Sequence, residues 1–160
     1  MMDIICDLFL ATPIQGDTPW LKKLALFHRE FVPKPERAYA GFLGLNISRL
    51  MAVAHVTTAR KDRIGILSIP VRYRDSTRLT EAEAMAAAVR QYPDWSLSTR
   101  SSYPALGNPM FYSFFGGPIS AEPSDEERAG GGNIAIDSLD GHAWVGDEMA
   151  IYHYDYCNLL

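Results

Sequence analysis

Candidate catalytic chemistry in this sequence centres on His142, which lies among Asp137, Asp140 and Asp147. A carboxylate that accepts a hydrogen bond from one ring nitrogen orients an imidazole, so His142 with Asp140 has the residue types of a general base. The same short segment is equally typical of a solvated hairpin turn. His142, His153 and the neighbouring carboxylates offer atoms that bind metals, but their spacing is not diagnostic of any metal. We expect no metal and no cofactor.

A second feature is the excess of acidic residues near the end of the chain. Residues 121–160 contain nine Asp and Glu and one Arg, whereas residues 1–120 contain 14 Lys and Arg and ten Asp and Glu. Such an excess argues against nucleic-acid binding through this segment, because phosphates would be repelled, and it favours a basic protein partner. We predict that the partner-binding residues are Glu122, Asp125, Glu126, Asp137, Asp140, Trp144, Asp147, Glu148, Tyr152 and Tyr154.

Aromatic residues in this segment have two interpretations. Residues 149–157 alternate in the manner of a strand, which would place Tyr152, Tyr154 and Tyr156 on one face. Such a face either packs under a helix with its hydroxyls at the rim or forms a contact surface, since Tyr and Trp are enriched in binding hot spots. Trp144 either anchors a partner or fills the core.

The common signatures of nucleotide-binding proteins and hydrolases do not occur. The sequence has no GxxxxGK[ST], no GxGxxG between a strand and a helix, no HExxH, no GxSxG and no EF-hand loop. Because no complete catalytic set is present, we expect a binding protein rather than an enzyme.

Composition predicts one ordinary globular domain spanning residues 1–160. Apolar residues make up 48% and charged residues 21% of the 160 residues. The first residues lack the features of a signal peptide, and no apolar run is long enough to span a membrane. Cys6 and Cys157 are expected to be free thiols in a reducing cytoplasm, although a bridge between terminal strands is the alternative in an oxidising compartment.

The spacing of apolar residues and the positions of Pro, Gly and capping residues predict an α+β fold. We expect a mostly antiparallel sheet with two or three helices packed on one face. A helix is expected from Pro19, capped by Asp17 or Thr18 and ended by Pro33 and Pro35. A second, capped by Asn46, is expected through about Lys61, and a third is expected after the capping box of Thr80 and Glu83 up to Tyr92. The expected strands are 2–10, 37–45, 63–73, 95–103, 109–115, 132–138, 142–146 and 149–157, with one long loop over 116–132.

The early helix PWLKKLALF and the late stretch GGGNIAIDSLDGHAWVGDE, in a small acidic chain, resemble the small immunity proteins that neutralise polymorphic bacterial toxins. Among these the chain is most similar to the immunity protein 52 family, which is associated with restriction-endonuclease-like toxins. The resemblance implies a cytoplasmic inhibitor that occludes one cognate toxin with a basic surface, does not bind nucleic acid or membrane, and exists as a monomer or small homo-oligomer. The alternatives are a small enzyme that uses His142 and Asp140, and a homo-oligomeric structural or phage-associated protein.

Overall fold

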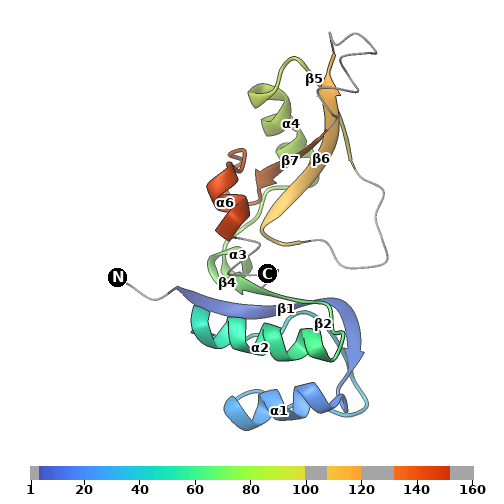
Figure 1. The fold of residues 1–160 in the computed structure, drawn as a ribbon, viewed down its shortest axis with the longest axis vertical. Coiled ribbons are helices and arrows are strands. Elements are labelled where there is room, and N and C mark those ends of the chain that lie inside the picture. The colour runs from blue at the N-terminus through green and yellow to red at the C-terminus, as the bar shows by residue number, and fades with distance from the viewer. Residues whose placement is uncertain (1–3, 100–107, 120–131, 152–160) are drawn as a thin grey trace. The chain divides into compact units, whose positions relative to one another are not determined.

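The computed structural model describes residues 4–99, 108–119 and 132–151, and these form an α+β fold with antiparallel strand pairing, as predicted (Figure 1). The described strands divide between two sheets rather than forming one. The chain splits into two compact units: residues 4–75 and 147–151 belong to the first, and residues 76–99, 108–119 and 132–146 to the second. Each unit is described by itself, and the expectation of a single domain stays a prediction.

The sheet of the first unit is built around β1 (Ile5–Gln15). Phe9 pairs with residues of both β2 (Ala38–Phe42) and β4 (Ile66–Pro70), so these two strands lie on opposite edges of β1. The short β3 (Ile47–Ser48) pairs with the start of β1, on the same edge as β2. Five consecutive residues of β1, Cys6–Leu10, are buried, as expected for a strand covered on both faces.

Two helices cover this sheet, in the order sheet, α2, α1 (Figure 1). The helix α1 (Pro19–Phe27) has Pro19 in its first turn, and it buries Trp20, Leu21 and Leu24. It ends at Phe27, well before Pro33, because the chain becomes extended at His28. Thr18 is the N-cap residue, but its hydroxyl donates to the carbonyl of Gln15 instead of capping the helix.

The helix α2 (Arg49–Lys61) begins two residues later than predicted. Its cap is Ser48, whose hydroxyl oxygen accepts from the Met51 amide at 3.3 Å. Asn46 was the wrong choice, because its side-chain oxygen instead accepts from Arg74 at 2.8 Å.

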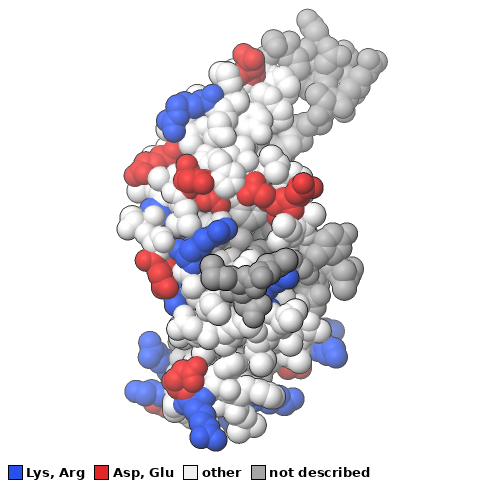
Figure 2. Space-filling model, turned by 90° about the vertical axis from the view of Figure 1, so that its left-hand side faces the viewer, with Lys and Arg blue, Asp and Glu red and all other residues white. Residues whose placement is uncertain are grey.

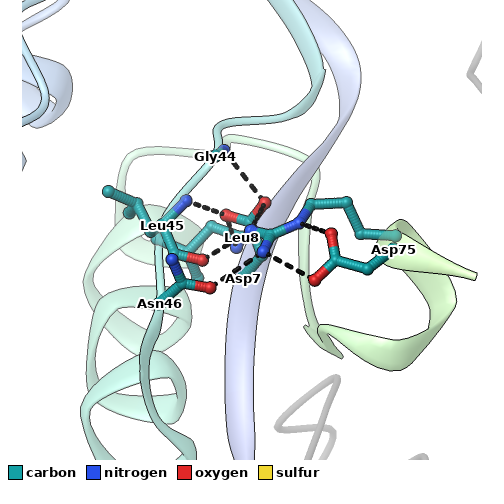
Figure 3. Close-up of polar contacts among 7 residues, drawn as sticks. Asp7, Leu8, Gly44, Leu45, Asn46 and Asp75 are labelled. Carbon is teal, nitrogen blue, oxygen red and sulfur yellow. Dashed lines mark hydrogen bonds and ion pairs between the residues drawn. The ribbon is translucent and has the colours of Figure 1, made fainter.

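A buried polar network ties β1 to the chain before β3 (Figure 3). The Asp7 side chain is fully buried and accepts from the backbone amides of Leu8, Gly44 and Leu45 at 2.7–2.9 Å. The Arg74 guanidinium donates to Asp7 at 3.1 Å and to the Leu45 carbonyl at 2.7 Å. Asp7 is thus a structural residue that joins three segments far apart in the sequence.

Arg74 reaches this network because the chain turns after β4. The predicted strand 63–73 is only partly correct: β4 ends at Pro70, which has no amide to donate, and α3 (Arg72–Asp75) follows. Arg72 packs over the Tyr73 ring at 5.0 Å, and Arg74 points back to Asp7.

Cys6 lies inside the first sheet. It is completely buried with a free thiol. Burial raises the pKa of the Cys6 thiol to about 11, so it is protonated and a poor nucleophile at neutral pH. Cys157 lies outside the described residues.

The second unit packs one helix on a three-stranded sheet of order β5-β6-β7, formed by β5 (Trp95–Thr99), β6 (Phe111–Pro118) and β7 (Gly132–Asp137). Its helix α4 (Glu81–Gln91) is capped by Thr80, whose hydroxyl oxygen accepts from the Glu83 amide at 3.2 Å, as predicted. The core consists of small helix residues against larger strand residues, namely Ala84, Ala87, Ala88, Phe114, Ile134 and Ile136. Small side chains on α4 let the helix approach the sheet closely.

The end of the described chain differs most from the prediction. The strand expected over 142–146 is reduced to a single bridge between Ala143 and Ile136. The strand expected over 149–157 is wrong where it can be compared, because residues 146–151 form the helix α6 (Gly146–Ile151). Asp147 and Glu148 in its first turn suit the positive end of a helix dipole. Tyr152, Tyr154 and Tyr156 lie outside the described residues, as do Glu122, Asp125 and Glu126.

Candidate functional site

Several of the predicted site residues meet in residues 137–144, which we call the acidic turn. The turn follows β7 and reverses the chain, with the Asp137 amide donating to the His142 carbonyl at 2.9 Å. The Trp144 amide donates to Ala135 at 2.8 Å, beside the bridge of Ala143 to Ile136. The sequence therefore predicted correctly that the chain reverses its direction here, although the strand expected after the turn is only a bridge.

Asp137 holds the acidic turn from inside. Its side chain is 3% exposed, and one carboxylate oxygen accepts from the amides of Leu139 and Asp140 at 2.9 and 3.3 Å. The other oxygen accepts from the indole N–H of Trp144 at 3.0 Å. The prediction that Asp137 faces a partner is wrong, because its oxygens satisfy amide groups of the turn itself.

The helix α4 fixes the other side of the acidic turn. The Gln91 amide nitrogen donates to the Gly141 carbonyl at 2.7 Å, and its oxygen accepts from the Ala143 amide at 2.9 Å. Gly141 has a φ of +78°, and an added Cβ would lie 3.2 Å from the Ala87 side chain. Only glycine fits this conformation and this packing without strain. No sequence signal identified Gln91, because a glutamine at a helix end has no characteristic spacing.

Asp140 and His142 form the exposed part of the acidic turn. The Asp140 carboxylate accepts from the His142 amide at 2.9 Å and from the imidazole Nδ1 at 2.5 Å. Partial desolvation raises the pKa of Asp140, but the hydrogen bonds from His142 outweigh it, so the pKa lies below its ordinary value. The Asp140 side chain is 66% exposed and the His142 side chain 42% exposed. The turn thus presents a fixed carboxylate to solvent.

Trp144 is held at the base of the acidic turn. Its ring packs against Phe111 with centroids 4.8 Å apart, and its N–H donates to Asp137. The side chain is half-buried. Trp144 therefore packs into the second unit and leaves part of its ring accessible, and its role as a partner anchor stays a prediction. An aromatic surface that is already fixed loses little side-chain entropy on binding.

The carboxylates of Asp137 and Asp140 and the His142 ring provide atoms within 4.8 Å of one another, a set that a metal ion can use. The hydrogen bonds account for this proximity, however, since Asp137 accepts three N–H groups and Asp140 accepts two. We assign the cluster to the stability of the turn.

Asp147 and Glu148 open α6, which follows the acidic turn in the sequence. Asp147 is exposed and Glu148 half-buried. Both side chains lie in the first helical turn, where a carboxylate is favoured by the helix dipole.

The two other described histidines form a buried pair that the sequence did not reveal. The Nε2 atoms of His28 and His55 are 2.9 Å apart, and the side chains are 9% and 8% exposed. One ring must donate and the other accept, so the pair requires at least one neutral imidazole. Burial, and next the nearby His28, lower the pKa of His55.

This pair predicts a loss of stability in mild acid. The pKa of His55 is lower in the folded than in the unfolded protein, so above about pH 6.5 both states are neutral and stability is complete. Below that pH the unfolded chain takes up a proton that the folded protein resists, and the free energy of unfolding falls until the pH drops below the folded pKa. Urea unfolding between about pH 7.5 and pH 5 measures this slope.

His55→Gln should flatten the pH dependence, because it removes the ring whose protonation the folded protein resists. An unchanged slope in His55→Gln would refute the assignment to the pair.

Among the described residues, no helix is both long and apolar enough to cross a membrane. Comparison with protein-family models, with characterised proteins and with solved structures gives no match to this chain. The functional interpretation therefore rests on the chemistry and geometry of the site.

Proposed function

We propose that the protein is an inhibitor of the immunity type, which binds a toxin with a basic surface and blocks it by occlusion. The observation that carries the proposal is the acidic turn: a carboxylate, Asp140, is held outward on a turn fixed from inside by Asp137 and Gln91. A group already held in one geometry loses little entropy when a partner binds it, so the energy of the contact is retained. The half-buried Trp144 ring beside it supplies apolar contact area.

The distribution of charge supports the same proposal. Described residues of the second unit include five Asp and Glu and two Lys and Arg. Those of the first unit include eight Asp and Glu, of which Asp147 and Glu148 lie in α6, and eleven Lys and Arg. On the face drawn in Figure 2, Lys and Arg predominate around α1 and α2, at the lower end of the view. A basic partner is therefore attracted to the second unit and repelled from α1 and α2, which speeds association with the second unit. Nuclease toxins fit this partner, because they need a basic groove to hold phosphates.

Charge reversal tests the proposal against a candidate toxin, which we expect to be encoded by a gene next to that of this protein. We expect the triple variant Asp140→Lys, Asp147→Lys, Glu148→Lys to associate at least ~10-fold more slowly at low salt, with a smaller difference at high salt, where the charges are screened. Surface plasmon resonance at two salt concentrations measures both rates.

The matched control reverses three exposed carboxylates of the first unit, Asp17, Glu30 and Glu36. It changes the net charge by the same amount but leaves the acidic turn intact, so it should retain most of the association rate. Equal effects of the two triple variants would mean that net charge alone matters and would contradict a defined binding surface.

The short contact between His142 and Asp140 favours one other candidate, a small enzyme with His142 as its general base. His142→Gln separates the two functions, because it removes the base but preserves the exposed Asp140 carboxylate. An inhibitor keeps its protection against the toxin in this variant, whereas an enzyme that acts through His142 loses its turnover while its folding is unchanged.

A further inference from the structure

A cavity of about 380 Å³ lies between the two helices of the first unit. The Trp20 N–H donates to the Thr58 hydroxyl at 3.1 Å, and His28 meets His55, so α1 and α2 run antiparallel and the cavity follows the groove between them (Figure 1). Its volume falls within the range of small-molecule sites, which is roughly 300–1,000 Å³. The proposed function does not use this cavity.

The cavity walls are mainly apolar. Leu24 and Trp20 form buried parts of the lining, and Ala54 contributes a small side chain from α2. Phe27 and Met51, which also line the cavity, are 68% and 42% exposed. These large apolar side chains stand in water beside an open apolar cavity. A ligand that covers them removes apolar surface from water, which lowers the free energy.

Three charged side chains line the groove, and two of them, Lys61 and Asp62, lie at one end. Thr58 marks this end through its bond to Trp20, and Lys61 lies one helical turn beyond it, next to Asp62. Lys23 lines the cavity from α1. In the described part of the chain, neither lysine forms an ion pair. Two ammonium groups against one carboxylate leave the rim positive.

The uncharged polar groups of the lining are already satisfied. The Thr58 hydroxyl accepts from Trp20 and donates to the His55 carbonyl, and His55 Nε2 is bonded to His28. The lowered pKa of His55 keeps its ring neutral at neutral pH. A ligand therefore meets an apolar groove with two lysines in its lining, and among the described residues Lys23, Lys61 and Asp62 form no ion pair.

We propose that this α1–α2 cavity binds a medium-chain carboxylate, with its alkyl chain along Leu24, Phe27 and Met51 and its carboxylate at Lys23 and Lys61. The helix from Met51 to Thr58 rises about 10 Å, which matches an extended chain of the length of octanoate or decanoate. The apolar walls supply the affinity, and the lysines select an acid over an alcohol.

Calorimetric titration of the full-length protein with decanoate, and separately with decanol, tests this proposal. Ala54→Trp fills the groove from an exposed position of α2 and should abolish saturable binding of both ligands. Leu50→Trp is the matched control, because Leu50 is 77% exposed and does not line the cavity. Circular dichroism shows whether each variant folds.

The lysines are tested one at a time. Lys23→Glu and Lys61→Glu should each weaken decanoate binding by roughly threefold or more and leave decanol binding unchanged, since an exposed ion pair contributes up to about 1 kcal/mol. Lys22→Glu, the neighbouring exposed lysine that does not line the cavity, should have little effect. Absence of saturable decanoate binding, or binding that persists in Ala54→Trp, would overturn the site. Equal loss in Lys22→Glu would overturn the role of the two lysines.

Discussion

Asp7→Ala is expected to lower the free energy of unfolding by about 3–5 kcal/mol, the loss typical of breaking a buried ion pair. The substitution leaves the amides of Gly44 and Leu45 and the Arg74 guanidinium without their common acceptor in a buried site (Figure 3). Urea unfolding followed by circular dichroism measures the change.

Two further variants make this prediction specific. Asp7→Asn keeps one acceptor oxygen and the shape of the side chain, so it should lose less stability than Asp7→Ala. Asp75→Asn removes the other carboxylate that contacts Arg74, but Asp75 is exposed, and water replaces the lost contact. If Asp75→Asn destabilises the protein as much as Asp7→Ala, burial is not the cause and the assignment fails.

Asp137→Ala is expected to cost about 3 kcal/mol and to weaken toxin binding as well. Two amides and the Trp144 indole lose their acceptor, and each buried unsatisfied group costs about 1–3 kcal/mol, partly recovered by relaxation and water. Because the same bonds fix Asp140 and Trp144, the binding loss should appear although Asp137 is buried. Thermal unfolding and binding affinity, measured on the same variants, check both effects.

The control for this prediction is Asp94→Ala. Asp94 is an exposed acidic residue of the same unit, so its removal lowers the charge equally without releasing the turn. Comparable loss of binding in both variants would indicate charge alone. Full binding by Asp137→Ala would contradict the idea that the turn must be held in place.

Local signals predicted the helices best. Pro19 and Thr80 mark helix starts by chemistry that acts within one turn, and both helices occur where these residues place them. The strands 37–45 and 95–103 overlap β2 and β5 because their patterns match a pleated surface. The end of the chain was misjudged, since the alternation from Met149 also fits a short helix that opens with Asp147 and Glu148.

The candidate site was predicted by composition but not by geometry. An excess of acidic residues predicts a surface of one sign; Asp140 is exposed, as such a surface requires, and the binding surface itself stays a prediction. Asp137 belongs to the same run of the sequence yet points inward, because its place at the end of β7 aims its oxygens at the turn amides. Partners far away in the sequence, such as Gln91 for Gly141 or Arg74 for Asp7, depend on tertiary contacts that no local pattern encodes.

Protection of cells from the candidate toxin tests the central proposal most directly. Co-expression of the wild-type protein with that toxin should restore growth, and the triple variant Asp140→Lys, Asp147→Lys, Glu148→Lys should not, at equal soluble levels of both proteins. Lethality of the toxin that the wild-type protein does not relieve would contradict the proposed inhibition, and full protection by the triple variant would contradict its electrostatic basis.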